Sequence, residues 1–226
     1  MLFLLTGEIK TGKTRWLSQL IESLEAAGVG CHGLLSPGIW RESDDINGNV
    51  VFEKLGIEAV LMPDGIRFPF AKRRDLIEVD GGKDDGWQSN KAGLGWVIPD
   101  EAIDAVNKHF DALAQSPLLQ PPLSTQQPSP LSQLPSALSQ PSGLLVVDEL
   151  GILELRGGGG FVSAVRLLEQ GSCELFEHAL VVVRRELLDA AIQRFSGVWD
   201  EVSVIVADED SRDLVLRAFE ERQCFG

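Results

Sequence analysis

The sequence predicts an α/β fold, a doubly wound parallel sheet that carries helices on both faces. Two observations predict it. Five short apolar runs contain no alternation of polar and apolar residues, which is typical of strands buried on both sides. Segments with helical periodicity lie between these runs, and alternating strands and helices are typical of parallel sheets with right-handed crossovers. The length of 226 residues fits one domain, 1–226, with accessory insertions.

The apolar runs and the amphipathic segments can be placed along the chain. Strands are expected at residues 2–5, 29–35, 144–147, 179–183 and 202–206. Apolar residues three and four positions apart predict helices around residues 16–24, 103–113, 188–195 and 214–219, each with one buried face. Ligands of such a sheet bind beyond the carboxyl ends of its strands, so a site is expected in the segments that follow the runs.

An insertion at residues 38–95 interrupts this rhythm. Its first part, residues 38–74, is predicted to form short antiparallel strands, because Asn47-Gly48 and Asp64-Gly65 are strong hairpin-turn signals. Its second part, residues 80–95, is rich in Gly and Asp and is predicted to be a mobile loop.

A Pro/Ser/Gln-rich tether is predicted at residues 116–142. These 27 residues contain seven Pro, seven Ser, five Gln and no charged residue. Such a composition sustains neither a helix nor a β-ladder, so we expect an extended, disordered segment. It is either a tolerated surface insertion or a docking site for a protein partner, although no basic residue flanks the prolines to orient a ligand of that type.

The composition argues against several function classes. A formal net charge of −14 is unfavourable for a broad surface that binds nucleic acid or an anionic membrane. No apolar run approaches the roughly 20 residues that a membrane span requires. The three cysteines, Cys31, Cys173 and Cys224, are far apart and without metal-ligand spacing, so reduced thiols in a cytoplasmic protein are expected.

The most specific motif reads G-x-x-x-x-G-K-T and lies between the first predicted strand and the first predicted helix. It is the pattern of a P-loop, in which glycines turn the backbone tightly and backbone amides point at nucleotide phosphates. The lysine reaches the β- and γ-phosphates, and the threonine hydroxyl binds Mg²⁺. The alternative is a glycine-rich turn without a ligand. The motif comprises Gly7, Glu8, Ile9, Lys10, Thr11, Gly12, Lys13 and Thr14.

A second motif is the apolar strand that ends in Asp148 and Glu149. In a P-loop enzyme the first acid, Asp148, is expected to hold the magnesium shell opposite Thr14. The second acid, Glu149, is expected to orient or deprotonate the water that attacks the γ-phosphate. Two acidic residues at a strand end are also common where their side chains are simply solvated or cap the next helix. The position of this pair after a phosphate loop favours the catalytic interpretation.

Residues 148–155, D-E-L-G-I-L-E-L, resemble the D-E-[IL]-G-x-M-E-L signature of a family of small P-loop nucleoside triphosphatases with kinase-like folds and broad nucleotide acceptance. The similarity extends to the phosphate loop, to Gly33-Leu34-Leu35 with Trp40-Arg41-Glu42, to Gly95-Trp96-Val97 and to Arg212-Asp213. It covers most of the chain outside the tether. Leu153 replaces the usual Met, and Ser211 stands where the family has Asn.

Phosphoryl transfer requires positive charge beyond Lys13 and magnesium. Arg41 is the first candidate, because its segment matches the family; the alternative is a surface arginine of a hairpin. Arg184 and Arg185 follow a strand on the ligand side of the sheet. Residues 72–74, Lys-Arg-Arg, act either as a lid over phosphates or as partners of nearby acidic residues.

Together these motifs predict a magnesium-dependent nucleoside triphosphatase that cleaves the γ-phosphate of ATP and GTP, and the lack of an obvious base-reading motif is consistent with acceptance of other NTPs. Two alternatives stay open. One is a kinase on the same scaffold, with residues 72–74 closing over a small acceptor. The other is a nucleotide-dependent switch or adaptor with slow hydrolysis and a protein partner.

Overall fold

The computed structural model describes residues 1–8, 11–44, 46–77, 88–91, 95–116 and 143–220. These residues form one nine-stranded sheet with the order β6-β5-β4-β2-β7-β8-β1-β9, and β3 pairs with β4 beside this path. The strands are β1 (Leu2–Leu5), β2 (Cys31–Leu35), β3 (Gly38–Asp44), β4 (Val50–Met62), β5 (Ile66–Arg73), β6 (Trp96–Val97), β7 (Gly143–Leu150), β8 (Phe176–Val183) and β9 (Val202–Ile205).

The five apolar runs form the parallel half of this sheet, in the order β2-β7-β8-β1-β9. This half confirms the predicted fold class. All four residues of β1 are fully buried, because helices cover the sheet on both sides, as a continuous apolar strand requires.

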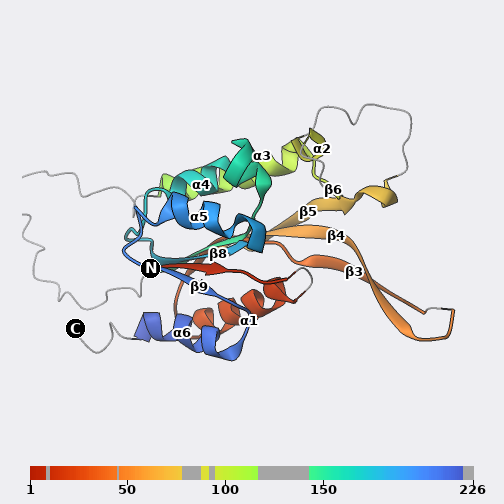
Figure 1. Cartoon of the computed structure of the whole chain (residues 1–226), viewed down its shortest axis with the longest axis horizontal. Helices are drawn as coiled ribbons and strands as arrows, with labels where there is room; N and C mark the ends of the chain where they lie inside the picture. The colour runs from red at the N-terminus through yellow and green to blue at the C-terminus, as the bar shows by residue number, and fades with distance from the viewer. Residues whose placement is uncertain (9–10, 45, 78–87, 92–94, 117–142, 221–226) are drawn as a thin grey trace, which may run out of the picture.

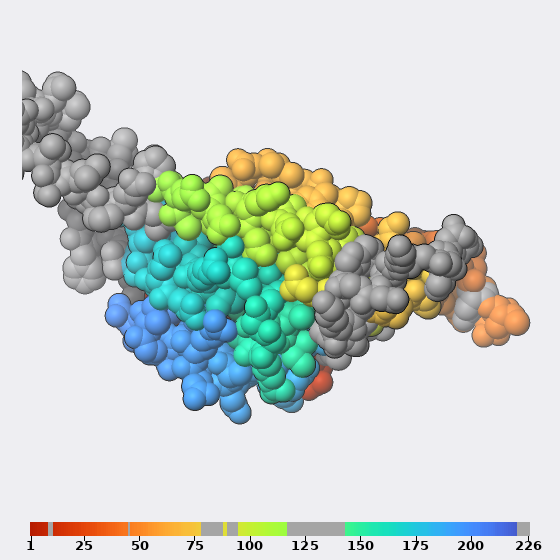
Figure 2. Space-filling model, turned by 90° about the horizontal axis from the view of Figure 1, so that it is seen from above, coloured from red at the N-terminus to blue at the C-terminus, as the bar shows by residue number. Residues whose placement is uncertain are grey.

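Two helical layers enclose the sheet (Figure 1). On one face lie α1 (Lys13–Ala26) and α6 (Glu209–Glu220), and on the other lie α3 (Asp100–Ala114), α4 (Val162–Leu168) and α5 (Leu188–Phe195). Successive residues of β1 contribute to two separate cores: Phe3 and Leu5 pack toward α1, and Leu2 and Leu4 pack toward the other layer. Figure 2 looks onto that second layer, where α3 and α4 lie side by side. The short helix α2 (Gln88–Lys91) lies beside β6.

The predicted hairpins are present but extend the main sheet. Gly48 and Gly65 occupy the two predicted turns, with φ of 77° and 66° in the region that favours glycine. The strand between them, β4, has 13 residues and is therefore longer than the short strands expected. One edge of β4 pairs first with β3 and then with β2, and the other edge pairs with β5. The antiparallel strands thus continue the parallel half, and the β3–β4 end stands clear of the helices (Figure 1).

Some predicted segments fall outside the described residues. They are residues 117–142 of the tether and residues 80–87 and 92–94 of the loop in the insertion. Cys31 and Cys173 are free thiols, and burial raises the pKa of Cys31 to about 12. No helix in the described ranges has the length and apolar character needed to cross a bilayer.

Candidate active site

The predicted phosphate loop connects β1 to α1. Its structure is described except at Ile9 and Lys10. Gly7 and Gly12 have positive φ, 145° and 85°, and Gly12 caps α1 in the left-handed conformation. A side chain at Gly12 would strain this turn, which brings the chain directly into the helix. The first amides of α1 therefore face the loop, as an anion-binding helix N-terminus requires.

Lys13 folds back over this loop. Its Nζ donates hydrogen bonds to the carbonyl oxygens of Glu8, at 2.7 Å, and Gly7, at 3.1 Å. The Thr11 hydroxyl also donates to the Glu8 carbonyl, at 2.9 Å. The ammonium group thus lies within the curve of the loop, where the sequence places the phosphate-binding lysine.

Thr14 and Asp148 meet across the site although 134 residues separate them. The Thr14 hydroxyl donates to Asp148 Oδ1 at 3.3 Å, and the Ser36 amide donates to Asp148 Oδ2 at 3.0 Å. Asp148 is only 4% exposed. Burial raises the pKa of its carboxyl to about 6, while the Ser36 amide, the Thr14 hydroxyl and the charge of Lys54 act in the opposite direction.

These two oxygen groups fit a magnesium ion. Mg²⁺ prefers hard oxygen ligands and is often held by one or two carboxylates together with substrate phosphates and water. A hydroxyl and a carboxylate beside a phosphate loop match this donor set. No cage of three or more His, Cys, Asp or Glu side chains occurs in the ranges that the structure describes.

Glu149 occupies an irregularity at the end of β7. Asp148 pairs with Val182 and Leu150 pairs with Val183, so Glu149 is the extra residue of a bulge. Such a bulge locally re-aims a side chain. Here the Glu149 carboxylate forms an ion pair with the guanidinium of Arg184, the first residue after β8. Leu150, the last residue of β7, is fully buried.

Arg184 and Arg185 emerge at the centre of the site, because β8 lies between β1 and β7. Arg184 binds Glu149, and Arg185 Nη1 lies 3.0 Å from Glu8 Oε1 in the phosphate loop. The structure therefore brings both arginines to the ligand side of the sheet. One contacts the acidic pair and the other contacts the loop.

No family model matches this chain, and no curated protein matches it significantly. Among solved structures, a human cancer-related nucleoside triphosphatase is 18% identical, with a TM-score of 0.51; the match covers 99% of this chain and 96% of that one. THEP1 from the hyperthermophile Aquifex aeolicus is 12% identical, with a TM-score of 0.50, and the match covers 96% of both chains. The chain has the fold of the P-loop NTPases.

In this P-loop NTPase fold, the strand that leads into the phosphate loop and the strand that carries the acidic pair are not neighbours. β8 pairs with both of them. This order explains why residues after β8 contact Glu8 and Glu149, and no local pattern in the sequence discloses it.

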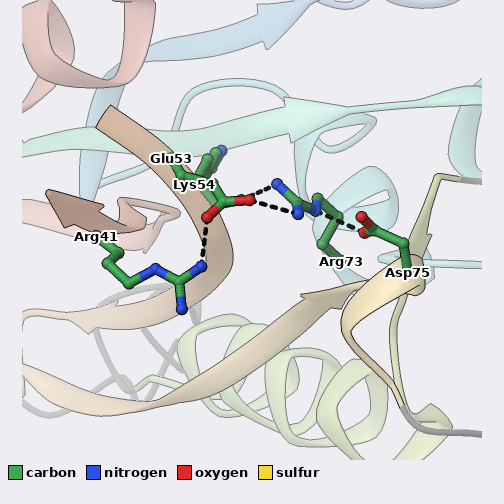
Figure 3. A network of polar contacts seen from close by, with 5 residues as sticks. All are labelled: Arg41, Glu53, Lys54, Arg73 and Asp75. Carbon is green, nitrogen blue, oxygen red and sulfur yellow. Dashed lines mark hydrogen bonds and ion pairs between the residues drawn. The ribbon is translucent and has the colours of Figure 1, made fainter. Parts of the chain in front are cut away.

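Arg41, by contrast, contacts a carboxylate of the hairpin. It lies on β3, its side chain is 56% exposed, and its Nη2 is 2.5 Å from Glu53 Oε2 on β4. Figure 3 shows Arg41 and Arg73 converging on Glu53 from two sides. Arg73 also binds Asp75, at 2.6 Å. The role of Arg41 at a phosphate stays a prediction, and Arg73 is engaged in the hairpin network.

Two residues near the site were missed. Glu154 is 7% exposed, and its carboxylate accepts the amides of Gly151, at 2.8 Å, and Phe161, at 2.9 Å. It thereby fixes the segment that follows the acidic pair; its place in the D-E-L-G-I-L-E-L stretch was a signal that could have found it. The positive charge of Lys54, on β4, lowers the pKa of Asp148 against the larger effect of burial. No motif in the sequence marks this lysine.

Proposed function

We propose that this protein is a magnesium-dependent nucleoside triphosphatase that hydrolyses the γ-phosphate of ATP, GTP and other NTPs. The main support is the hydrogen bond between Thr14 and Asp148, which joins the start of α1 to the end of β7 beside Lys13. The phosphate-loop motif and the acidic strand end are each weak evidence alone, but this hydrogen bond brings them together. The human protein with the same fold is described as a nucleoside triphosphatase.

Binding of the nucleotide rests on the loop. Amides at the start of α1 and the turn at Gly7 and Gly12 would receive the phosphate oxygens. Lys13 would exchange its two carbonyl partners for the β- and γ-phosphates, a motion of one side chain. Broad nucleotide choice follows because these contacts recognise phosphates and no base.

Thr14 and Asp148 would hold the magnesium ion, which, when bound, neutralises charge on the β- and γ-phosphates. Their oxygens already face one another. The Ser36 amide orients the Asp148 carboxylate through the second oxygen, so the first oxygen is directed to Thr14 and the ligand side.

Glu149 would position the attacking water and accept its proton. As the water oxygen bonds to the γ-phosphorus, the bond between that phosphorus and the bridging oxygen breaks, and the diphosphate leaves with the electron pair. The bulge gives Glu149 an orientation different from that of buried Asp148. Arg184 contacts Glu149 and is therefore the arginine best placed to orient this carboxylate and to bind the γ-phosphate. Arg41 is the alternative candidate for the phosphate contact.

The test is phosphate release from ATP, GTP, CTP and UTP with Mg²⁺, with Lys13→Ala and Glu149→Gln as variants. We expect the wild type to hydrolyse several NTPs. Both variants should lose most of this activity, while Glu149→Gln still binds nucleotide. A wild type that binds nucleotide and releases no phosphate contradicts the proposal.

A further inference from the structure

The hairpin of β3 and β4 exposes large apolar side chains where it stands clear of the helices (Figure 1). Trp40 of β3 is 53% exposed, and Phe52 and Val50 of β4 are 62% and 54% exposed. Ile46, between the two strands, is fully exposed. Single apolar side chains are common on protein surfaces, but a group of them on one element is typical of an interaction site. The hairpin is therefore a candidate docking surface.

The register of the β3–β4 ladder places three of these apolar side chains on one face together with two acidic ones. Glu42 pairs with Phe52 and Asp44 pairs with Val50, and Trp40 lies two residues before Glu42. Paired residues share a face of the sheet, and so do residues two apart on one strand. We call these five residues the docking face. Apolar and carboxylate groups alternate on it.

The opposite face of the hairpin already has its charges paired. Arg41 and Glu53 lie opposite one another and form an ion pair at 2.5 Å, which Arg73 joins at 2.6 Å (Figure 3). On the docking face, Glu42 and Asp44 are exposed, and neither forms an ion pair within the described part of the chain. Carboxylates beside aromatic rings favour long basic side chains, whose stems pack on the rings while their charged ends pair with the acids.

The strand β3 also offers backbone groups for pairing. Among the residues that the structure describes, its strand partner is β4 alone, so the N–H and C=O groups along its other edge have no strand beside them. An extended peptide adds to such an edge through main-chain hydrogen bonds, and the neighbouring side chains select its sequence. The edge and the docking face together define both the conformation and the charge of the partner.

A second copy of this chain is a poor occupant of that edge. Two copies of β3 would pair antiparallel about a two-fold axis. A pairing centred on Arg41 or Glu42 places that residue opposite its own copy, and one centred on Ser43 places Glu42 opposite Asp44. Each arrangement sets like charges against one another, which is destabilising. The net charge of −14 adds repulsion between the copies.

We propose that the docking face and the free edge of β3 bind an extended segment of another protein that carries Lys or Arg at every second position. The segment adds as a strand beside β3. Its basic side chains cover Trp40 and pair with Glu42 and Asp44. This role lies beyond the proposed hydrolysis and does not depend on it.

The experiment uses a short fluorescent peptide of alternating lysine and valine, and measures its binding to the full chain by fluorescence anisotropy at low salt. A peptide with glutamate in place of lysine is the charge-reversed probe. The double variant Glu42→Lys/Asp44→Lys reverses the charge of the docking face. Asp104→Lys/Asp111→Lys makes the same change in net charge on the exposed side of α3 and is the matched control. Thermal unfolding shows whether each variant keeps the fold.

We expect the lysine peptide to bind the wild type with a Kd on the order of 10–100 µM, and the glutamate peptide to bind at least about tenfold more weakly. The docking-face variant should reverse this preference, and the control variant should keep it. Hydrogen exchange of the β3 amides should slow when the lysine peptide binds, as strand addition requires.

Three results overturn the inference. They are no binding of the lysine peptide, an unchanged preference in the docking-face variant, and binding that leaves the exchange of the β3 amides unaltered. If sedimentation shows that the wild type dimerises through this hairpin, the surface belongs to a second copy and the inference fails as well. Phosphate release from NTPs is measured separately, so none of these results decides the proposed function.

Discussion

Arg184 is ion-paired with Glu149 across the ends of two neighbouring parallel strands, β8 and β7. The pair depends on the bulge at Glu149, which separates the pairing of Asp148 from that of Leu150. The contact joins the residue proposed to activate water to the arginine best placed for the γ-phosphate. It makes Arg184 the most informative position to change.

Replacing Arg184 with Ala is expected to lower phosphate release from ATP by about tenfold to a thousandfold, because an arginine that contacts the transferring phosphoryl stabilises transition-state charge. Nucleotide affinity should change much less than turnover. Steady-state kinetics and calorimetry separate the two effects. Arg166→Ala, on the exposed side of α4, is the matched control. An Arg184→Ala enzyme with unchanged turnover would limit this residue to a structural role.

Changing Thr14 to Ala should weaken the binding of Mg²⁺, since the hydroxyl beside Asp148 is a proposed metal ligand. We expect about tenfold more Mg²⁺ to be needed for half-maximal phosphate release. Thr14→Ser keeps the hydroxyl and should stay close to the wild type. Magnesium titrations at saturating ATP provide the measurement, and equal magnesium requirements for all three proteins would contradict the assignment.

Asp148→Asn is expected to stabilise the fold at neutral pH. Burial raises the folded-state pKa of Asp148 from 3.8 to about 6, so the folded protein binds a proton that the unfolded chain has released. The free energy of unfolding therefore falls as the pH rises between these values. Two pKa units correspond to roughly 3 kcal/mol at pH 7, an upper limit for the gain.

Urea unfolding without magnesium, between about pH 5 and pH 8, measures this effect. The stability difference between Asp148→Asn and the wild type should grow with pH until it levels off above about pH 7. Asp189→Asn makes the same replacement of a carboxylate by an amide at an exposed position of α5 and serves as the control. A difference that does not vary with pH would show that Asp148 titrates normally in the fold.

Glu154→Ala is expected to lower the free energy of unfolding by about 2–5 kcal/mol, because it leaves the buried amides of Gly151 and Phe161 without their acceptor. Glu169→Ala removes an exposed carboxylate that pairs with Arg194 and should cost at most about 1 kcal/mol. Urea unfolding of both variants at one pH makes the comparison. Similar losses would mean that the two amides find other partners.

Local patterns were sufficient for much of the fold. The five apolar runs all became parallel strands, and both glycine turns of the insertion were found where Asn47-Gly48 and Asp64-Gly65 indicated them. Helix α4 was missed. Its seven residues are apolar on most sides and follow a glycine run, so they show little of the periodicity that marks a half-exposed helix.

What the sequence determined by itself is the character of each short segment: a glycine-rich loop entering a helix, an acidic strand end, and strands too apolar to face water. These features depend on neighbours in the chain. The tertiary structure alone decided which segments meet. Strand order placed Arg184 beside Glu149 and directed Arg41 to Glu53. Such contacts join residues far apart in the chain, and their pairing follows from the packing of the whole sheet.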